Sequence, residues 1–132
     1  MRSFRGLAVA VLLSCLPVVL VAGVSGGVGS FFKQIPGTDR RVPITDATLA
    51  DKVIFQILIV TQDGEYPLQI NVYDGSGREV YNAESTVVAK DGRAGALVSY
   101  GFNPGRDAPG TWWYVAALDG RVVASNSLKV SQ

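Results

Sequence analysis

Four Asp-Gly pairs divide the second half of the sequence into short runs, and this spacing constrains the fold more than any other feature. The pairs are Asp63-Gly64, Asp74-Gly75, Asp91-Gly92 and Asp119-Gly120. Asp and Gly both tolerate positive φ, so the pair favours the tight turns that join antiparallel strands. The runs between the turns are rich in β-branched and aromatic residues, and we expect strands at Val53–Thr61, Pro67–Tyr73, Arg78–Ala89, Ala94–Phe102, Thr111–Leu118 and Arg121–Val130.

A shorter run, Arg41–Leu49, adds an expected edge strand, because Pro43 cannot donate to a strand ladder. About seven short antiparallel strands at this spacing predict an all-β sandwich. Edge strands of such a sandwich can accept a strand from a partner, and Arg41–Leu49 and Arg121–Val130 are the candidate edges.

Alternation of side chains predicts which residues form the core. Leu68, Ile70 and Val72 share one face of their strand. The run Val53–Val60 differs, because it is apolar on both faces except at Gln56, which predicts that something covers both sides. In the last two strands the expected inward residues are Trp112, Tyr114, Ala116, Leu118, Val122, Ala124, Leu128 and Val130, with Asn126 an exception that marks a bulge.

The final hairpin resembles that of bacterial immunoglobulin-like modules. Its residues are Pro109-Gly110-Thr111-Trp112, then Val115, the turn Asp119-Gly120 and a closing strand to Val130. The stretch Val72–Val80 resembles the middle hairpin of the same modules, and the resemblance covers roughly residues 42–130. It implies an immunoglobulin-like fold without specifying a function. Asp107 and Gly110 resemble the corner before strand F, with one extra residue and Trp112 in place of Tyr.

The N-terminal region contains no charged residue between Arg5 and Lys33. A helix over Leu7–Val24 would be about 27 Å long, close to the thickness of a bilayer core. We therefore expect an N-terminal hydrophobic helix in residues 1–30, serving as signal peptide or transmembrane anchor with a Gly-rich junction, followed by the β-sandwich in residues 31–132.

Three fates of this segment remain open. A cleaved signal peptide would be cut near Val21-Ala22-Gly23 or Val24-Ser25-Gly26. A retained anchor fits the length of the segment, with Phe31-Phe32 and Lys33 at the interface. Leu12-Leu13-Ser14-Cys15 resembles a lipobox, in which Cys15 would be lipidated. All three place the domain outside the cytoplasm, either at the cell membrane on the periplasmic side or, after signal cleavage, secreted or periplasmic.

The composition argues against catalysis. The chain has no histidine, its one cysteine lies in the hydrophobic segment, and its net charge is +1. The commonest general base and zinc ligand are therefore missing, and no basic block marks a nucleic-acid interface. We expect no enzyme activity, no catalytic residue, no cofactor, no metal and no nucleic-acid partner.

Surface aromatic residues are the remaining lead, because Trp and Tyr concentrate binding energy. If Trp112 points inward, Trp113 points outward, and the expected register places Tyr73, Trp113, Val115 and Val123 on one outer face. The first hypothesis is a membrane-anchored accessory subunit that docks on a protein partner through this face. The alternative is a released ligand- or glycan-binding module, in which Gln69 and Asn71 assist the aromatic residues.

Overall fold

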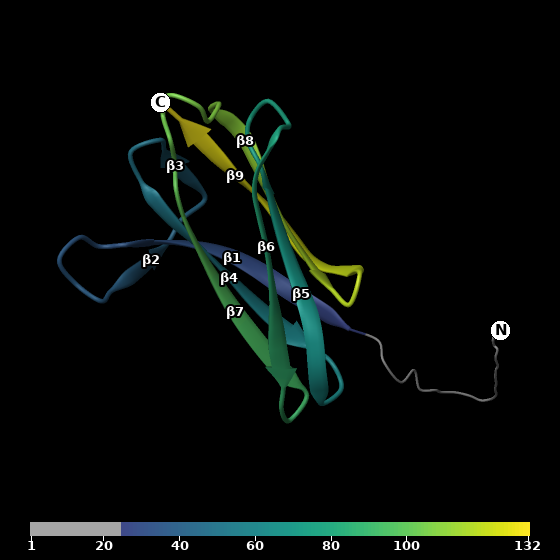
Figure 1. Ribbon diagram of the computed structural model, residues 1–132. Helices are drawn as coiled ribbons and strands as arrows, with labels where there is room; N and C mark the ends of the chain where they lie inside the picture. Colours follow the sequence, from purple (N-terminus) through teal and green to yellow (C-terminus); the bar gives the residue numbers. More distant parts are fainter. Residues whose placement is uncertain (1–24) are drawn as a thin grey trace.

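The computed structural model describes residues 25–132 and shows two β-sheets packed face to face (Figure 1). All neighbouring strands are antiparallel except β3 and β9, which are parallel. The expected all-β sandwich is confirmed, with nine strands in the described residues instead of about seven. The four-stranded sheet has the order β2 (Arg41–Pro43), β1 (Gly26–Gln34), β4 (Lys52–Val60) and β7 (Arg93–Gly101). The five-stranded sheet has the order β3 (Asp46–Thr48), β9 (Arg121–Ser131), β8 (Gly110–Leu118), β5 (Gly64–Tyr73) and β6 (Glu79–Ala89).

The run Arg41–Leu49 forms two edge strands instead of one. Strand β2 pairs with β1 in the four-stranded sheet, while β3 pairs with β9 in the other. The chain crosses between the sheets at Ile44 and Thr45, directly after Pro43, which interrupts the first ladder. This crossing ties one edge of the sandwich together, and it places β9 between β8 and β3.

Strand β1 is the main element that the sequence analysis missed. It begins at Gly26, so the sandwich starts before the expected boundary at residue 31. Glycines usually weaken a strand, which is why this stretch resembled a junction. Here Gly29 lies against the ring of Phe55, and a Cβ at Gly29 would overlap that ring. The glycine therefore serves close packing between β1 and β4.

The expected N-terminal helix and Cys15 lie outside the described residues. Within residues 25–132 there is no helix long and apolar enough to cross a membrane. Since β1 takes up Gly26–Gln34, the apolar sequence that remains before the domain is Leu7–Val24, separated from β1 by Ser25 alone.

Two of the four Asp-Gly pairs form the expected turns with positive φ at both residues. The angles are 56° and 78° at Asp91-Gly92, and 52° and 81° at Asp119-Gly120. The other two aspartates act through their side chains. Asp63 accepts a hydrogen bond from the Gly92 amide at 2.7 Å, and Asp74 accepts several bonds described below.

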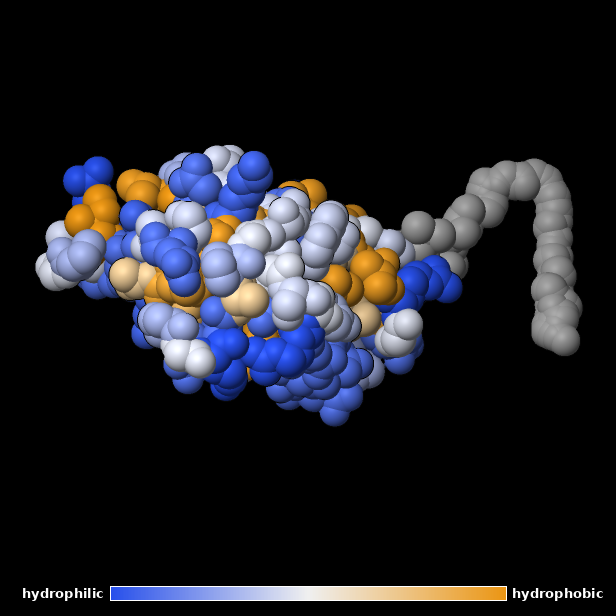
Figure 2. Space-filling view, turned by 90° about the horizontal axis from the view of Figure 1, so that it is seen from above, coloured by the Kyte–Doolittle hydropathy of each residue, from blue (hydrophilic) through white to orange (hydrophobic). Residues whose placement is uncertain are grey.

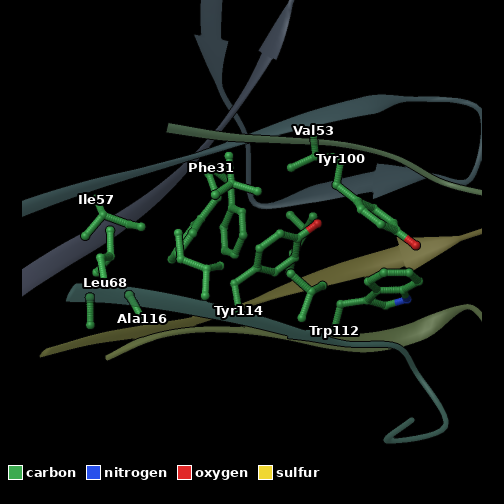
Figure 3. Close-up of a cluster of buried hydrophobic side chains, with 14 of the residues drawn as sticks. Phe31, Val53, Ile57, Leu68, Tyr100, Trp112, Tyr114 and Ala116 are labelled. Carbon is green, nitrogen blue, oxygen red and sulfur yellow. The ribbon is translucent and has the colours of Figure 1, made fainter. Parts of the chain in front are cut away.

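The core lies between the sheets and is rich in aromatic side chains. Phe31, Phe55 and Tyr114 pack with ring centroids 5.0–5.1 Å apart. Figure 3 shows Tyr114 and Trp112 pointing from one sheet toward Phe31, Val53 and Tyr100 on the other. The hydroxyl of Tyr114 is buried and has no hydrogen-bond partner among the described residues. The expected inward residues Leu68, Ile70, Val72, Trp112, Tyr114, Ala116, Leu118, Ala124, Leu128 and Val130 are all buried.

Strand β9 departs from the expected register near its start. Ala116 pairs with Ala124 but Ala117 pairs with Val122, so Val123 is an extra residue in a β-bulge. The bulge turns Val123 into the core at 8% exposure and leaves Val122 at 59% exposure, the reverse of the prediction. Asn126, which was expected to mark a bulge, instead faces inward, and its Nδ2 donates to the Gly29 carbonyl at 2.9 Å.

Candidate functional site

The candidate site is the outer face of β5 and β8, where three of the four expected residues meet. Tyr73 and Trp113 are directly opposite each other on the two strands, and Val115 is opposite Asn71. Trp113 is 47% exposed, while Tyr73 and Val115 are half-buried. The predicted orientation of Trp113 is confirmed, because Trp112 is fully buried on the other face. We call Tyr73, Trp113 and Val115 the aromatic surface.

Val123 does not belong to the aromatic surface, and its predicted place there was wrong. The bulge in β9 turns its side chain between the sheets, where it is buried. The residues of β9 beside the aromatic surface are instead Ser127, opposite Trp113, and Ser125, opposite Val115. The surface is therefore bounded on this side by small hydroxyl residues.

Polar side chains bound the surface on the β6 side. Asn71 and Asn82 are cross-strand neighbours, and each donates to one carboxylate oxygen of Glu79 at 3.2 Å. Glu79 in turn lies opposite Tyr73. Gln69 points to the same outer face, as expected, because it pairs with Ala117 and Glu84. The arrangement is an apolar centre with a polar rim.

The turn after Tyr73 is fixed by Asp74, whose side chain is buried. Its carboxylate accepts bonds from the Ser76 hydroxyl at 2.6 Å and from the backbone amides of Ser76, Arg78 and Ala108 at 3.0–3.2 Å. Burial alone would raise the pKa of Asp74, but the hydrogen bonds from Ser76, Ala108 and Arg78 outweigh it and lower the pKa to about 2. Because Ala108 precedes β8, this carboxylate joins the end of β5 to the entry of β8.

A second buried carboxylate fixes the loop before β8. Asp107 accepts bonds from the Tyr100 hydroxyl at 2.9 Å, the Asn103 amide at 2.8 Å and Arg106 Nε at 2.9 Å. Burial opposes ionisation, yet the bonds from Arg106, Asn103 and Tyr100 lower the pKa of Asp107. Burial and the neighbouring carboxylate also raise the pKa of Tyr100.

The corner that the resemblance implied is present. Trp112 Nε1 donates to the Ala108 carbonyl at 2.7 Å, which fastens the buried indole to the loop directly before its own strand. With Asp74 and Asp107, this bond sets the position of β8 and hence of Trp113 on the outer face. The two buried carboxylates thus act as supports of the aromatic surface.

The geometry supports binding by contact rather than acid–base chemistry. Both buried carboxylates already accept several hydrogen bonds from the protein, so neither is free to act as a base. Across residues 25–132, no group of three or more His, Cys, Asp or Glu residues could hold a metal ion. An exposed indole beside a phenol and a valine can bind a partner through apolar and stacking contacts.

The sequence analysis missed the Asp107 cluster, although one signal was available. Asp107 follows Arg106 in a loop between two strands with aromatic residues, and a neighbouring guanidinium can donate a charge-assisted hydrogen bond to such a carboxylate. Its partner Tyr100 was assigned to a strand without a role for its hydroxyl. The turn expected at Asp74-Gly75 is present, but Asp74 fixes it through its carboxylate and not through a positive φ.

Comparison with known proteins supports the fold. No protein-family model matches the chain, and no curated protein sequence matches it significantly. Among solved structures, it is similar to an immunoglobulin-like protein from Pseudomonas aeruginosa, with a TM-score of 0.52, 16% identity, and coverage of 85% of this chain and 97% of the other. It is also similar to a CARDB domain from Pyrococcus furiosus, with a TM-score of 0.52, 9% identity, and coverage of 89% and 96%.

A β-glucosidase from Listeria innocua contains a similar region, with a TM-score of 0.54 and 12% identity over 83% of this chain. The match spans only 16% of that enzyme. At these identities the likeness shows the fold alone. The expected immunoglobulin-like sandwich is thereby confirmed, and the chain has the fold of a β-sandwich module.

Proposed function

We propose that this protein is a non-catalytic accessory module, attached to a membrane through Leu7–Val24, that docks on a protein partner through the aromatic surface. The observation that carries the proposal is the direct pairing of Tyr73 with the 47% exposed Trp113 on the outer face. Apolar contact residues inside a polar rim are typical of protein interfaces. The lack of histidine and the engagement of both buried carboxylates support a role without catalysis.

Attachment can be tested by carbonate extraction of membranes and mass spectrometry of the N-terminus. An intact Met1 in the membrane pellet supports a retained anchor, and a lipid adduct on Cys15 supports lipidation. A soluble chain that begins near Val24–Val28 would refute membrane attachment and leave a released domain.

Docking can be tested by photo-crosslinking in intact cells. A photoreactive phenylalanine at position 113 should give a protein adduct that the same residue at position 86 does not give, because Thr86 is exposed on the same sheet but pairs with Pro67, away from the aromatic surface and its polar rim. Adding Tyr73→Ala should reduce the yield at position 113. Equal yields at both positions would refute docking through this surface.

Glycan binding is the alternative, and the polar rim is the observation that favours it. Asn71 and Glu79 lie beside Tyr73, where they can contact sugar hydroxyls while the rings stack on the sugar. Oligosaccharides should then change the fluorescence of the exposed Trp113 and should have no effect in Trp113→Phe. A saturable response of this kind would favour the glycan-binding module over the protein-docking one.

A further inference from the structure

The four-stranded sheet has an apolar outer face that no part of residues 25–132 covers. Val28 pairs with Leu58 across β1 and β4, and Leu97 continues the surface onto β7. Val28, Leu58, Val60 and Leu97 are 62%, 55%, 66% and 55% exposed. Isolated surface hydrophobic residues are ordinary, but neighbouring ones on adjacent strands mark an interaction surface. We call the following residues the outer apolar face: Val28, Phe32, Ile54, Leu58, Val60 and Leu97.

This face explains the two-sided apolar pattern of Val53–Val60. One side of β4 packs in the core, whereas the other side, with Ile54, Leu58 and Val60, points out of the sandwich. A strand with two apolar sides is normally covered on both. The covering element is therefore expected to come from outside the described residues.

The charged residues that point outward from the four strands themselves have one sign. Asp51, which lines a hollow beside Lys52 and Ile54, is ion-paired with Lys33 at 3.6 Å. The outward-facing charged residues of β1, β2, β4 and β7 are Arg41, Lys52 and Arg93, and none is acidic. Arg41 reaches over the sheet to line a shallow groove with Leu58 and Leu97. Stacking a second copy on this face would bring like charges together, whereas an anionic surface would complement them.

The position of the N-terminal segment points to the same surface. Gly26 pairs with Val60 at the end of the outer apolar face, and Leu7–Val24 joins the domain there through Ser25. Two other exposed valines, Val88 and Val122, lie at strand ends on this end of the sandwich. In the view of Figure 2, hydrophobic side chains reach the surface next to the point where the grey trace begins.

We propose that the outer apolar face lies on an anionic phospholipid bilayer, with its apolar side chains in the interface and Arg41, Lys52 and Arg93 bound to headgroup phosphates. This inference rests on the membrane attachment in the proposed function. Because the aromatic surface belongs to the other sheet, it then points away from the bilayer toward a partner.

The test places a polarity-sensitive fluorophore on the face of the full-length chain. In a Cys15→Ser background, Leu97→Cys is labelled with nitrobenzoxadiazole and the protein is reconstituted into phosphatidylglycerol–phosphatidylcholine vesicles. Leu97 is chosen because it lies in the middle of β7, away from the joined segment. The matched control is Asn82→Cys, exposed on the opposite sheet. Circular dichroism of each labelled variant verifies that the fold is retained.

We expect a blue shift and increased intensity at position 97 in anionic vesicles, with position 82 unchanged. The measured quantity is the ratio of molecules whose outer apolar face contacts the bilayer to molecules whose face is in water. Replacing Arg41, Lys52 and Arg93 by Gln should lower this ratio by about five-fold per charge, on the order of a hundred-fold in the triple variant. High salt should act in the same direction.

Three results would overturn the inference, and they are distinguishable. A chain with Cys15 intact that does not float with the vesicles refutes the membrane attachment itself. A chain that floats while position 97 stays as water-exposed as position 82 refutes only the lipid contact. A blue shift that depends on protein density and not on lipid charge assigns the face to a second copy of the chain.

Discussion

Replacing Tyr114 by Phe is expected to stabilise the domain, although Tyr114 is one of its most deeply buried residues. The side chain is 0% exposed, and its ring packs against Phe31 and Phe55 at centroid distances of 5.0 and 5.1 Å. Its hydroxyl has no hydrogen-bond partner within the described part of the chain. The substitution keeps the ring contacts and removes only the unpaired polar group.

The magnitude follows from the cost of desolvating a hydroxyl that forms no bond. This cost is about 1–3 kcal/mol, and part of the gain is lost with the small space left by the oxygen, so we expect about 1 kcal/mol of stabilisation. For a domain of this size, that corresponds to a rise in Tm of about 4–8 °C.

The matched control is the same substitution at Tyr100, a second buried tyrosine in the same core. The Tyr100 hydroxyl donates to Asp107 at 2.9 Å and accepts from Arg106 at 2.8 Å. Removing it leaves a buried carboxylate with one fewer donor, so Tyr100→Phe should cost about 1.5–3 kcal/mol. One chemical change is thus expected to have opposite signs at two tyrosines.

Urea unfolding followed by near- and far-UV circular dichroism gives both free energies of unfolding. Equal slopes with urea concentration are required, so that the midpoints report stability alone. A loss of more than about 1 kcal/mol in Tyr114→Phe would refute the reasoning, because it would mean that the hydroxyl is hydrogen-bonded in solution.

Three further predictions test the buried carboxylate of Asp74, the close packing at Gly29 and the bulge in β9. The folded-state pKa of Asp74 is about 2, below its ordinary value of 3.8. Its contribution to the free energy of unfolding is therefore present above about pH 4 and is lost as the pH falls toward 2. In Asp74→Asn, the free energy of unfolding should change less with pH over this range. Gly29→Ala should cost about 1–3 kcal/mol in urea unfolding, since a Cβ there overlaps a buried ring, whereas Gly26→Ala has open space and should change little. Val123→Ala should cost about 2 kcal/mol by thermal unfolding and Val122→Ala almost nothing; equal losses would contradict the bulge.

Much of the fold could be predicted because turn chemistry and alternation agree along the second half of the chain. Asp119-Gly120 adopts the positive φ that its residues permit, and Trp112 and Trp113 take opposite faces as strand geometry requires. The expected sandwich register put Tyr73 and Trp113 on one outer face, and the structure shows them directly opposite each other on two strands that are not adjacent in sequence. These features follow from the turn preference of Asp-Gly and from the alternation of side chains along a strand, and both can be read from the sequence.

The errors arose where tertiary packing overrides local preference. Strand β1 contains Gly29 because the ring of Phe55 fills the space of a side chain, and no local pattern reveals that ring. Val123 moved into the core because one extra residue in β9 reverses the alternation before it. The apolar residues on both sides of β4 did predict a second apolar surface. Only the sheet order shows that no other described strand covers it.

The parallel pairing of β3 with β9 has a consequence for the order in which the domain can fold. Strand β9 is the last strand of the described residues, yet it lies between β3 and β8 and pairs with both. Contacts between Ala47 and Val130 close a loop of most of the domain, and such long-range closure slows folding. The five-stranded sheet therefore cannot be completed until β9, at the C-terminal end of the described residues, is available to pair. The same topology predicts that removing Lys129–Ser131 slows or prevents folding, which stopped-flow refolding of the truncated chain would measure.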